Sequence, residues 1–198
     1  MKIGVIGAGN IGGTLGKKWA AAGHAVWFGV RQPADPKHAA LHGIGTVTGV
    51  AQAVAAADVL ALAQPGAAVA DFAAEYGPAL AGKLVIDTTN NVRSAEMHSL
   101  AALKAAAPQA RLARAFSTLG WENFADPQIG GVQLDLFFCS QPEARAAVEA
   151  LVADVGLRPV FLGDLDAAAA LDGLTRAWFA LAFGQGRGRR LAFKLLED

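Results

Sequence analysis

A glycine-rich turn between an apolar strand and a helix constrains the fold of this chain more than any other feature. Residues 2–6 form a short β-type run, and residues 7–12 read Gly-Ala-Gly-Asn-Ile-Gly. A helical pattern over residues 14–22 and a second β-type run over residues 25–29 follow directly. This order is typical of a dinucleotide-binding unit, in which a pyrophosphate lies on the free amides at the start of the helix. A glycine turn that binds nothing is the alternative.

The three glycines of this turn have separate predicted roles. Gly7 permits the tight turn, Gly9 lets the backbone approach a pyrophosphate, and Gly12 lets the helix pack close to the strand. We therefore predict that all three belong to a cofactor site.

The rest of the chain continues the alternation of strand and helix. Apolar runs predict further strands at residues 46–48, 58–63, 84–87, 111–116, 134–139 and 159–162. Helical patterns lie at residues 50–57, 67–76, 97–107 and 143–155, and residues 117–131 read as a loop-rich stretch. Apolar strands without polar alternation predict a parallel sheet covered on both faces, which is a Rossmann-type doubly wound α/β fold.

Composition excludes several classes of function. Lys plus Arg and Asp plus Glu both number 17, so no basic excess suggests nucleic acid or an anionic membrane as a partner. Cys139 is the only cysteine, which excludes a disulfide framework and a thiolate metal cluster. His38 and His42 are spaced i, i+4, but no third ligand is evident and we expect no metal site. Without a secretion signal or a membrane-spanning run, we expect a soluble cytoplasmic protein.

The end of the second strand indicates which dinucleotide binds. NAD-specific domains place an Asp or Glu there to hold the ribose hydroxyls. Here the strand ends Gly29-Val30-Arg31, and the first acid beyond it is Asp35, in a loop with two prolines. An arginine in place of the acid favours the 2′-phosphate of NADP, by charge and by the geometry of its guanidinium. A solvated loop arginine is the alternative.

Three further strand ends are expected to line the cofactor cleft, because ligands of open α/β sheets lie beyond the carboxyl ends of the strands. These ends are Gln64-Pro65, Thr88-Thr89-Asn90 and Ala115-Phe116-Ser117-Thr118. Small and amide side chains there can bind a ribose and a carboxamide. For any single residue, turn formation is an equally good explanation.

Five segments in order along nearly the whole chain carry a family resemblance. They are Gly7–Gly12, Gly29–Arg31, Asp87–Asn91, Ala115–Thr118 and Ala182–Gly186. Together they resemble the NADP reductase family that uses the deazaflavin coenzyme F420, to which the reductase domain of the STEAP metalloreductases is related. The resemblance implies a Rossmann domain with a small C-terminal part, usually a homodimer, that moves hydride between NADP and a flavin or deazaflavin. Val30 departs from the family, which often has Ser or Thr there.

The resemblance also implies roles for individual residues. Arg31 would hold the 2′-phosphate. The residues implied under the pyrophosphate are Gly9, Asn10 and Ile11, and those implied near the nicotinamide are Ala115, Phe116 and Thr118. We therefore predict an NADPH-dependent oxidoreductase with F420, FMN or FAD as acceptor. Hydride transfer needs positioning rather than a strong acid or base, so no catalytic residue is predicted.

Two alternative functions remain beside this one: a non-catalytic NADPH sensor, and a dehydrogenase of another small molecule. Phe116, Thr118 and Trp121 are candidates for the acceptor pocket, and Trp121 and Phe124 suit either a stacked acceptor ring or the core. We predict an NADP-binding domain over residues 1–163 and a C-terminal helical segment over residues 164–198 that completes the pocket.

The C-terminal segment is apolar on more than one helical face, so we expect a homodimer built largely on it. We expect residues 187–197 to form a last short helix. Its basic residues form either a solvated face or a patch that attracts an anionic cofactor tail, and they are Arg187, Arg189, Arg190 and Lys194.

Overall fold

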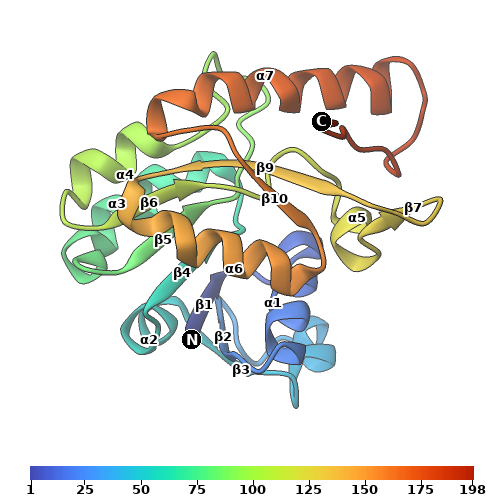
Figure 1. The fold of residues 1–198 in the computed structure, drawn as a ribbon. Coiled ribbons are helices and arrows are strands. Elements are labelled where there is room, and N and C mark those ends of the chain that lie inside the picture. The colour runs from blue at the N-terminus through green and yellow to red at the C-terminus, as the bar shows by residue number, and fades with distance from the viewer.

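Eight strands form one sheet with helices on both faces, and the computed structural model describes all residues, 1–198 (Figure 1). The strands of this sheet are β1 (Lys2–Ile6), β2 (Ala25–Val30), β3 (Thr46–Gly49), β4 (Val59–Leu62), β5 (Leu84–Asp87), β6 (Arg111–Arg114), β9 (Asp135–Ser140) and β10 (Arg158–Phe161). The α-helices are α1 (Asn10–Ala21), α2 (Val50–Ala56), α3 (Val69–Tyr76), α4 (Leu100–Ala106), α5 (Trp121–Ala125), α6 (Arg145–Val155) and α7 (Ala168–Phe179).

The order of the strands places a switch point beside β1. The sheet runs β10-β9-β6-β5-β4-β1-β2-β3, so the chain leaves β1 towards β2 and β3 on one side and then crosses to β4 on the other. Strands β1 to β6 are parallel to one another. Ligands of such sheets bind in the crevice outside the carboxyl ends of the strands at the switch point. The turns after β1 and β4 are therefore the expected walls of a site.

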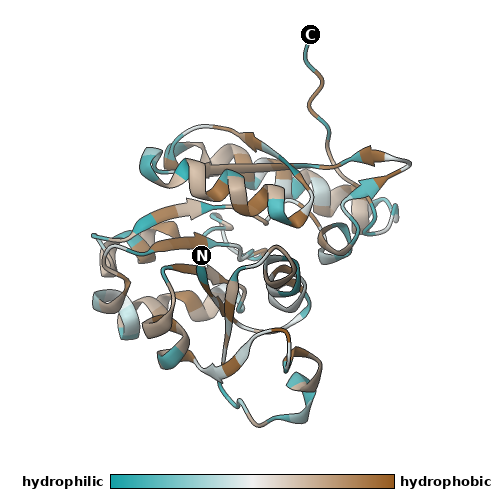
Figure 2. Ribbon diagram, turned by 60° about the horizontal axis from the view of Figure 1, so that its bottom comes forward, coloured by the Kyte–Doolittle hydropathy of each residue, from teal (hydrophilic) through white to brown (hydrophobic).

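Two hydrophobic cores lie on the two faces of the sheet. One core joins the sheet to α1 and α6 through residues such as Leu15, Trp19 and Val148. The other joins it to α2, α3, α4 and α7, and includes Phe72 and Leu171. Figure 2 shows hydrophobic residues along the strands between the two helical layers. Strands covered on both faces explain why their sequences lack polar alternation.

The predicted fold class is confirmed, with a difference at one edge of the sheet. Strand β9 pairs antiparallel with β6, and β10 is parallel to β9, so these two strands run against the other six. The stretch predicted as loop-rich contains α5 and the start of a hairpin, β7 (Gln128–Ile129) and β8 (Val132–Gln133). Gly130 and Gly131 connect the hairpin with positive φ angles of 59° and 79°, as a two-residue turn of this kind requires.

The prediction of a last helix at residues 187–197 is wrong. This segment has no regular secondary structure and lies along α5, β8 and β9. Gly186 and Gly188 have positive φ angles of 64° and 78°, which end the helical path. Beyond these glycines, backbone carbonyl groups accept hydrogen bonds from side chains outside the segment. The carbonyl of Leu191, for example, accepts from Trp178 Nε1 at 3.0 Å.

The basic residues of this segment are neither a solvated helix face nor a free patch, except for the exposed Arg187. Arg190 donates to the backbone or side chains of four residues, which are Glu122, Asn123, Asp126 and Gln128. Lys194 Nζ lies 2.6 Å from Asp135 Oδ1 and 3.0 Å from the carbonyl of Gln133. These ion pairs hold the C-terminal segment against the sheet.

Asp135 anchors the end of the chain, and we expect this anchor to fail in acid. Burial raises the pKa of Asp135, but hydrogen bonds from Arg158, Lys194 and the backbone of Leu195 outweigh it and lower the pKa. A carboxyl with a lowered pKa stabilises the folded state above its unfolded value, about pH 4, and loses this contribution as the pH falls through the lowered value. At neutral pH, Asp135→Asn should speed tryptic cleavage after Lys194 at least about fivefold, since charge-assisted hydrogen bonds are lost. Mass spectrometry measures this rate, and an unchanged rate would show that other contacts anchor the segment.

None of the helices has the length and apolar character needed to cross a bilayer. The division of the chain at residue 163 stays a prediction.

Candidate functional site

A cavity of about 940 Å³ opens at the carboxyl ends of β1 and β2. Its volume is at the upper end of the range for small-molecule and cofactor sites. Of the residues predicted to bind the cofactor, the structure places six on its wall: Gly7, Gly9, Asn10, Arg31, Gln64 and Pro65. We call it the first cavity.

The glycine turn forms the floor of the first cavity as its spacing predicts. Gly7 has a φ of 98°, a conformation that favours glycine. A Cβ on Gly12 would overlap with the carbonyl oxygen of Gly7, so Gly12 allows α1 to pack against the end of β1. A Cβ on Gly9 would meet nothing within 4 Å, because Gly9 faces open space.

The start of α1 supplies free donors to this floor. Gly9 is the N-cap of α1, and no side chain caps the helix. The first turn also lacks acidic residues. Unpaired N–H groups and the positive end of the helix dipole therefore face the cavity, which is an arrangement that binds phosphate groups.

Arg31 lies at the other end of the first cavity, directly after β2. It is exposed and takes part in none of the ion pairs of the structure. Lys37 lines the same end but pairs with Asp35 at 2.7 Å. Asp35 also accepts from the backbone N–H of Lys37 at 3.0 Å, and these contacts lower its pKa. Arg31 thus has no ion-pair partner, like Lys17 of α1 on the same cavity wall, whereas Lys37 and Asp35 are engaged with each other.

A second cavity, of about 250 Å³, continues from the first along the ends of β4 and β5. The two cavities share Ala63, Gln64 and Pro65 on their walls. The predicted residues Ile11, Thr88 and Asn90 line the second cavity. The C-terminal part of the chain adds Trp178, Phe179 and Arg189 to it. Arg189 is its only ionisable side chain.

Arg189 is held at this position by an ion pair. Its Nε lies 2.6 Å from Glu122 Oε1, and its guanidinium lies 5.8 Å from the ring centres of Trp178 and Phe183. Burial raises the pKa of Glu122, but the hydrogen bond from Arg189 and the charges of Arg189 and Arg190 outweigh it and lower the pKa. Glu122 is therefore ionised near neutral pH and balances the charge of Arg189.

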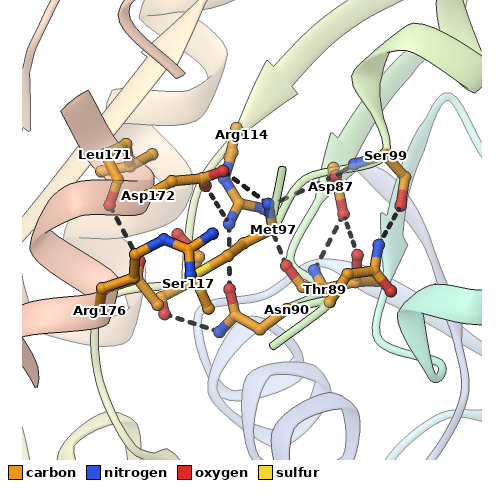
Figure 3. A network of polar contacts seen from close by, with 12 residues as sticks. Asp87, Thr89, Asn90, Met97, Ser99, Arg114, Ser117, Leu171, Asp172 and Arg176 are labelled. Carbon is orange, nitrogen blue, oxygen red and sulfur yellow. Dashed lines mark hydrogen bonds and ion pairs between the residues drawn. The ribbon is translucent and has the colours of Figure 1, made fainter. Parts of the chain in front are cut away.

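A buried polar network lies behind the second cavity (Figure 3). Its centre is Arg114, the last residue of β6, which is 0% exposed. Nη1 donates to the carbonyl of Thr89 at 2.8 Å and lies 3.7 Å from Asp87 Oδ2. Nη2 donates to Asn90 Oδ1 at 3.0 Å and lies 2.8 Å from Asp172 Oδ1. The network ties the ends of β5 and β6 to α7.

Three predicted residues lie behind the cavity walls rather than on them. Ala115 and Phe116 are completely buried, and Thr118 is almost so. Phe116 has a φ of 60°, the only positive value at a residue other than glycine, and its ring packs edge-on against Trp19 and Phe124. This turn directs Phe116 into the core and leaves the neighbouring Ser117 and Leu119 on the wall of the second cavity.

The two aromatic candidates of α5 separate. Phe124 is completely buried and belongs to the core. Trp121 is half-buried and lines the first cavity, not the second. Trp121 is thus placed beside the dinucleotide floor.

The other reactive side chains form no site. His38 is buried and His42 exposed, because their segment, Pro36–Leu41, is a 3-10 helix in which residues four apart do not share a face. No group of three potential ligands converges anywhere in the chain. Cys139 is buried in β9, and burial raises the pKa of its thiol to about 11, so it stays protonated near neutral pH.

Sequence reasoning missed several residues that line the cavities or support them. Those on the walls are Lys17, Gln32, Lys37 and His38 in the first cavity, and Val92, Trp178, Phe179 and Arg189 in the second. Arg114 had a signal, since a charged residue inside an apolar strand needs a buried partner. The C-terminal segment was predicted to complete the pocket, but the sequence did not indicate which of its residues reach the wall, because only the folded chain brings them to the sheet.

Known proteins are similar to this chain in sequence or in fold. Residues 2–91 match the model of the family described as NADP oxidoreductase, coenzyme F420-dependent. No curated protein matches the chain. A proposed F420-dependent NADP-reductase from Arthrobacter sp. FB24 is similar over 100% of both chains, with 23% identity and a TM-score of 0.83. A hypothetical protein from Sinorhizobium meliloti aligns over 100% of this chain and 96% of its own, with 25% identity and a TM-score of 0.72.

A reductive aminase from Aspergillus terreus, solved with NADPH and ethyl levulinate, is also similar, with 22% identity and a TM-score of 0.71. The match covers 93% of this chain but only 62% of the aminase. At this identity the likeness shows the fold alone.

The match over residues 2–91 confirms the resemblance predicted from the sequence. At the level of that family, the predicted enzyme class, an NADP-dependent oxidoreductase, and the predicted cofactor NADP(H) are also confirmed. The structural neighbours include a proposed F420-dependent NADP-reductase as well as imine reductases and a reductive aminase, so they do not distinguish between acceptors.

Proposed function

We propose that the protein transfers a hydride between NADP(H) and a flavin or deazaflavin, with F420, FMN or FAD as the acceptor. In the forward direction, the hydride leaves C4 of the nicotinamide with both electrons of its C–H bond. It forms a new bond on the central ring of the acceptor. NADPH and the oxidised acceptor thus become NADP⁺ and the anionic reduced acceptor, with no other reactant.

The continuity of the two cavities is the observation that carries this proposal. The first cavity offers a free guanidinium at one end and the free amides of α1 in the middle, which fit a 2′-phosphate and a pyrophosphate. The second cavity begins at the shared wall and suits the nicotinamide half. Phe179 and Trp178 give it the aromatic surface that a planar acceptor ring requires.

The lack of an acid or base in the second cavity also favours this reaction. Of its fifteen lining residues only Arg189 is ionisable, and a guanidinium does not release a proton near neutral pH. Direct hydride transfer between two stacked rings depends on proximity and orientation. Reduction of a carbonyl or imine normally adds a positioned proton donor, which these walls do not supply.

Two other functions follow from specific observations. The similarity to a reductive aminase suits reduction of an imine or another small molecule. The absence of a proton donor from the second cavity suits a sensor that binds NADPH without turnover.

A single experiment separates the three functions. The protein is mixed with NADPH without oxygen, and FMN, FAD, F420 or a panel of cyclic imines is added in turn. Bleaching of a flavin or F420 together with loss of NADPH absorbance supports the proposal. Oxidation of NADPH only with an imine favours the dehydrogenase, and tight binding without oxidation favours the sensor.

Phe179→Ala should lower acceptor turnover about tenfold, because an aromatic contact and its buried area are lost from the second cavity. The affinity for NADPH, measured by calorimetry, should change less than the KM for the acceptor. Phe161→Ala is the matched control, because Phe161 on β10 is partly buried against Phe138 and Arg145 and lines neither cavity. Equal losses in both variants would remove Phe179 from the acceptor site.

We also propose the division into an NADP-binding domain, residues 1–163, and a C-terminal segment, residues 164–198, that completes the second cavity. Phe183, Leu195 and Leu196 are large apolar side chains exposed on this segment, which supports assembly into a homodimer through it. A monomer mass by light scattering would contradict the dimer.

A further inference from the structure

The buried guanidinium of Arg114 determines which way the amide of Asn90 is oriented. An asparagine amide carries an oxygen that accepts hydrogen bonds and a nitrogen that donates two, and the two ends are nearly equal in shape. Every polar atom of the Arg114 side chain is a donor. The atom of Asn90 at 3.0 Å from Arg114 Nη2 is therefore the oxygen, Oδ1.

The nitrogen of the same amide then lies on the cavity side. Nδ2 donates one hydrogen to the carbonyl of Ser117 at 2.9 Å, and both Asn90 and Ser117 line the second cavity. Arg114 itself is completely buried and does not line it. Figure 3 shows the Asn90 side chain between Arg114 and Ser117. The second N–H of Nδ2 has no partner within the chain, so it is available to a ligand.

We propose that Arg114 is a positioning residue that makes Asn90 present an N–H donor to an oxygen of the nicotinamide half, either a ribose hydroxyl or the carboxamide oxygen. The inference rests on the proposed function only in placing that half of NADPH in the second cavity. A flipped amide would turn an acceptor towards the carboxamide oxygen and lose the hydrogen bond. Arg114, which does not itself line the cavity, thus determines that Asn90 presents a donor rather than an acceptor to the ligand.

Two carboxylates keep the guanidinium in place. Asp172 on α7 pairs with Nη2 and also accepts from the backbone N–H of Met97 at 2.7 Å. Asp87, on the Nη1 side, accepts from the backbone N–H groups of Thr89 and Ser99 at 2.9 and 2.6 Å. Because each carboxylate is itself held by the backbone, the guanidinium has one orientation. Docking of α7 through Asp172 is thereby linked to the orientation of Asn90.

The test compares two ligands that share the first cavity but not the second. Calorimetry gives the Kd of NADPH and of 2′,5′-ADP, which lacks the nicotinamide half, for the wild type and for Arg114→Met, Asp172→Asn and Asn90→Ala. Arg114→Met should weaken NADPH about tenfold, as expected for one lost hydrogen bond and its geometry, and leave 2′,5′-ADP within about twofold. Asn90→Ala should give the same pattern. The double variant should be no weaker than either single one, because both changes remove the same contact.

Loss of Arg114 leaves two buried carboxylates without their cation, which can prevent the Arg114→Met variant from folding. In that case Asp172→Asn provides the test. It keeps the shape of the side chain, and NADPH should weaken by a smaller factor with 2′,5′-ADP again unchanged. Asp154→Asn is the control: that carboxylate on α6 also forms an ion pair, with His24 Nε2 at 2.8 Å, but neither residue lines either cavity. It should change neither affinity.

Three results would overturn the inference. Equal weakening of both ligands would make Arg114 merely structural, additive losses in the double variant would separate Arg114 from Asn90, and unchanged NADPH affinity would show no role. If NADPH follows the expected pattern but no flavin or F420 is reduced, the proposed function fails and the positioning role stands.

Discussion

Arg31→Ala should weaken the binding of NADPH by about ten- to a hundredfold and leave the binding of NADH within about twofold, because a charge-assisted hydrogen bond contributes roughly 1.5–3 kcal/mol. Arg31 follows β2 directly, lines the first cavity and has no ion-pair partner in the chain. The neighbouring Val30 offers no hydroxyl to the phosphate, so we expect the lower part of the range. No carboxylate here is free to hold the ribose hydroxyls as in an NAD-binding domain, because Asp35 caps the next turn and pairs with Lys37.

Calorimetric titration of both cofactors into the wild type and Arg31→Ala measures this effect. Salt should weaken NADPH preferentially, because screening acts on the exposed charge pair. Arg145→Ala is the control, as Arg145 is an exposed arginine on α6, remote from the cavities, and pairs only with Glu149. Equal affinities of the wild type for NADPH and NADH, or a preference that survives in Arg31→Ala, would remove Arg31 from the phosphate site.

The parts of the site that could be predicted are those whose structure depends on residues close together in the sequence. The glycine spacing predicts the turn correctly because Gly7 and Gly12, five residues apart, pack against each other where β1 leads into α1. Arg31 is found because dinucleotide-binding folds place the residue that recognises the ribose or its 2′-phosphate near the end of the second strand. The strands of the sheet were also predictable, since apolar runs of four to six residues are long enough to show the pattern.

The remaining parts depend on contacts between distant residues. Pairing of β9 against β6 joins Ser140 to Ala113, and nothing in either strand indicates its direction. The C-terminal segment was expected to be a helix because of its composition, but its carbonyl groups bond Trp178 and Arg158 instead. For the second cavity, the sequence therefore predicts the strand ends and the participation of the C-terminal segment, but not which side chains of that segment, Trp178, Phe179 and Arg189, form the wall.

The position of Phe116 is instructive in the same way. The end of β6 was expected to supply Ala115, Phe116 and Thr118 to the ligand. A left-handed backbone at Phe116 could not be foreseen, because aromatic residues rarely adopt it and a packed core must hold it in place. The turn directs the Phe116 side chain into the core, and Ser117 lines the second cavity where Phe116 and Thr118 were expected.

Gly9→Ala should abolish tight NADPH binding while leaving the unliganded protein folded. Gly9 has φ −75° and ψ −163°, an extended conformation that alanine adopts freely, and the added Cβ meets nothing within 4 Å. Alanine should therefore leave the Tm unchanged or raise it slightly, by restricting the unfolded chain. The same Cβ would occupy the space where a pyrophosphate approaches the amides of α1. Loss of about two charge-assisted hydrogen bonds predicts at least a hundredfold higher Kd.

Two other glycines make this result specific. Gly173→Ala adds a methyl group to α7 in equally open space, so it should leave the NADPH affinity unchanged and stabilise the helix by up to about 1 kcal/mol. Gly12→Ala should instead lower the Tm sharply, because its Cβ collides with the Gly7 carbonyl and lies 2.9 Å from Val5 Cγ1. Thermal unfolding and calorimetry on the three variants separate a ligand-side role from a packing role. A Gly9→Ala protein that binds NADPH within threefold of the wild type would show that the pyrophosphate does not lie on this turn.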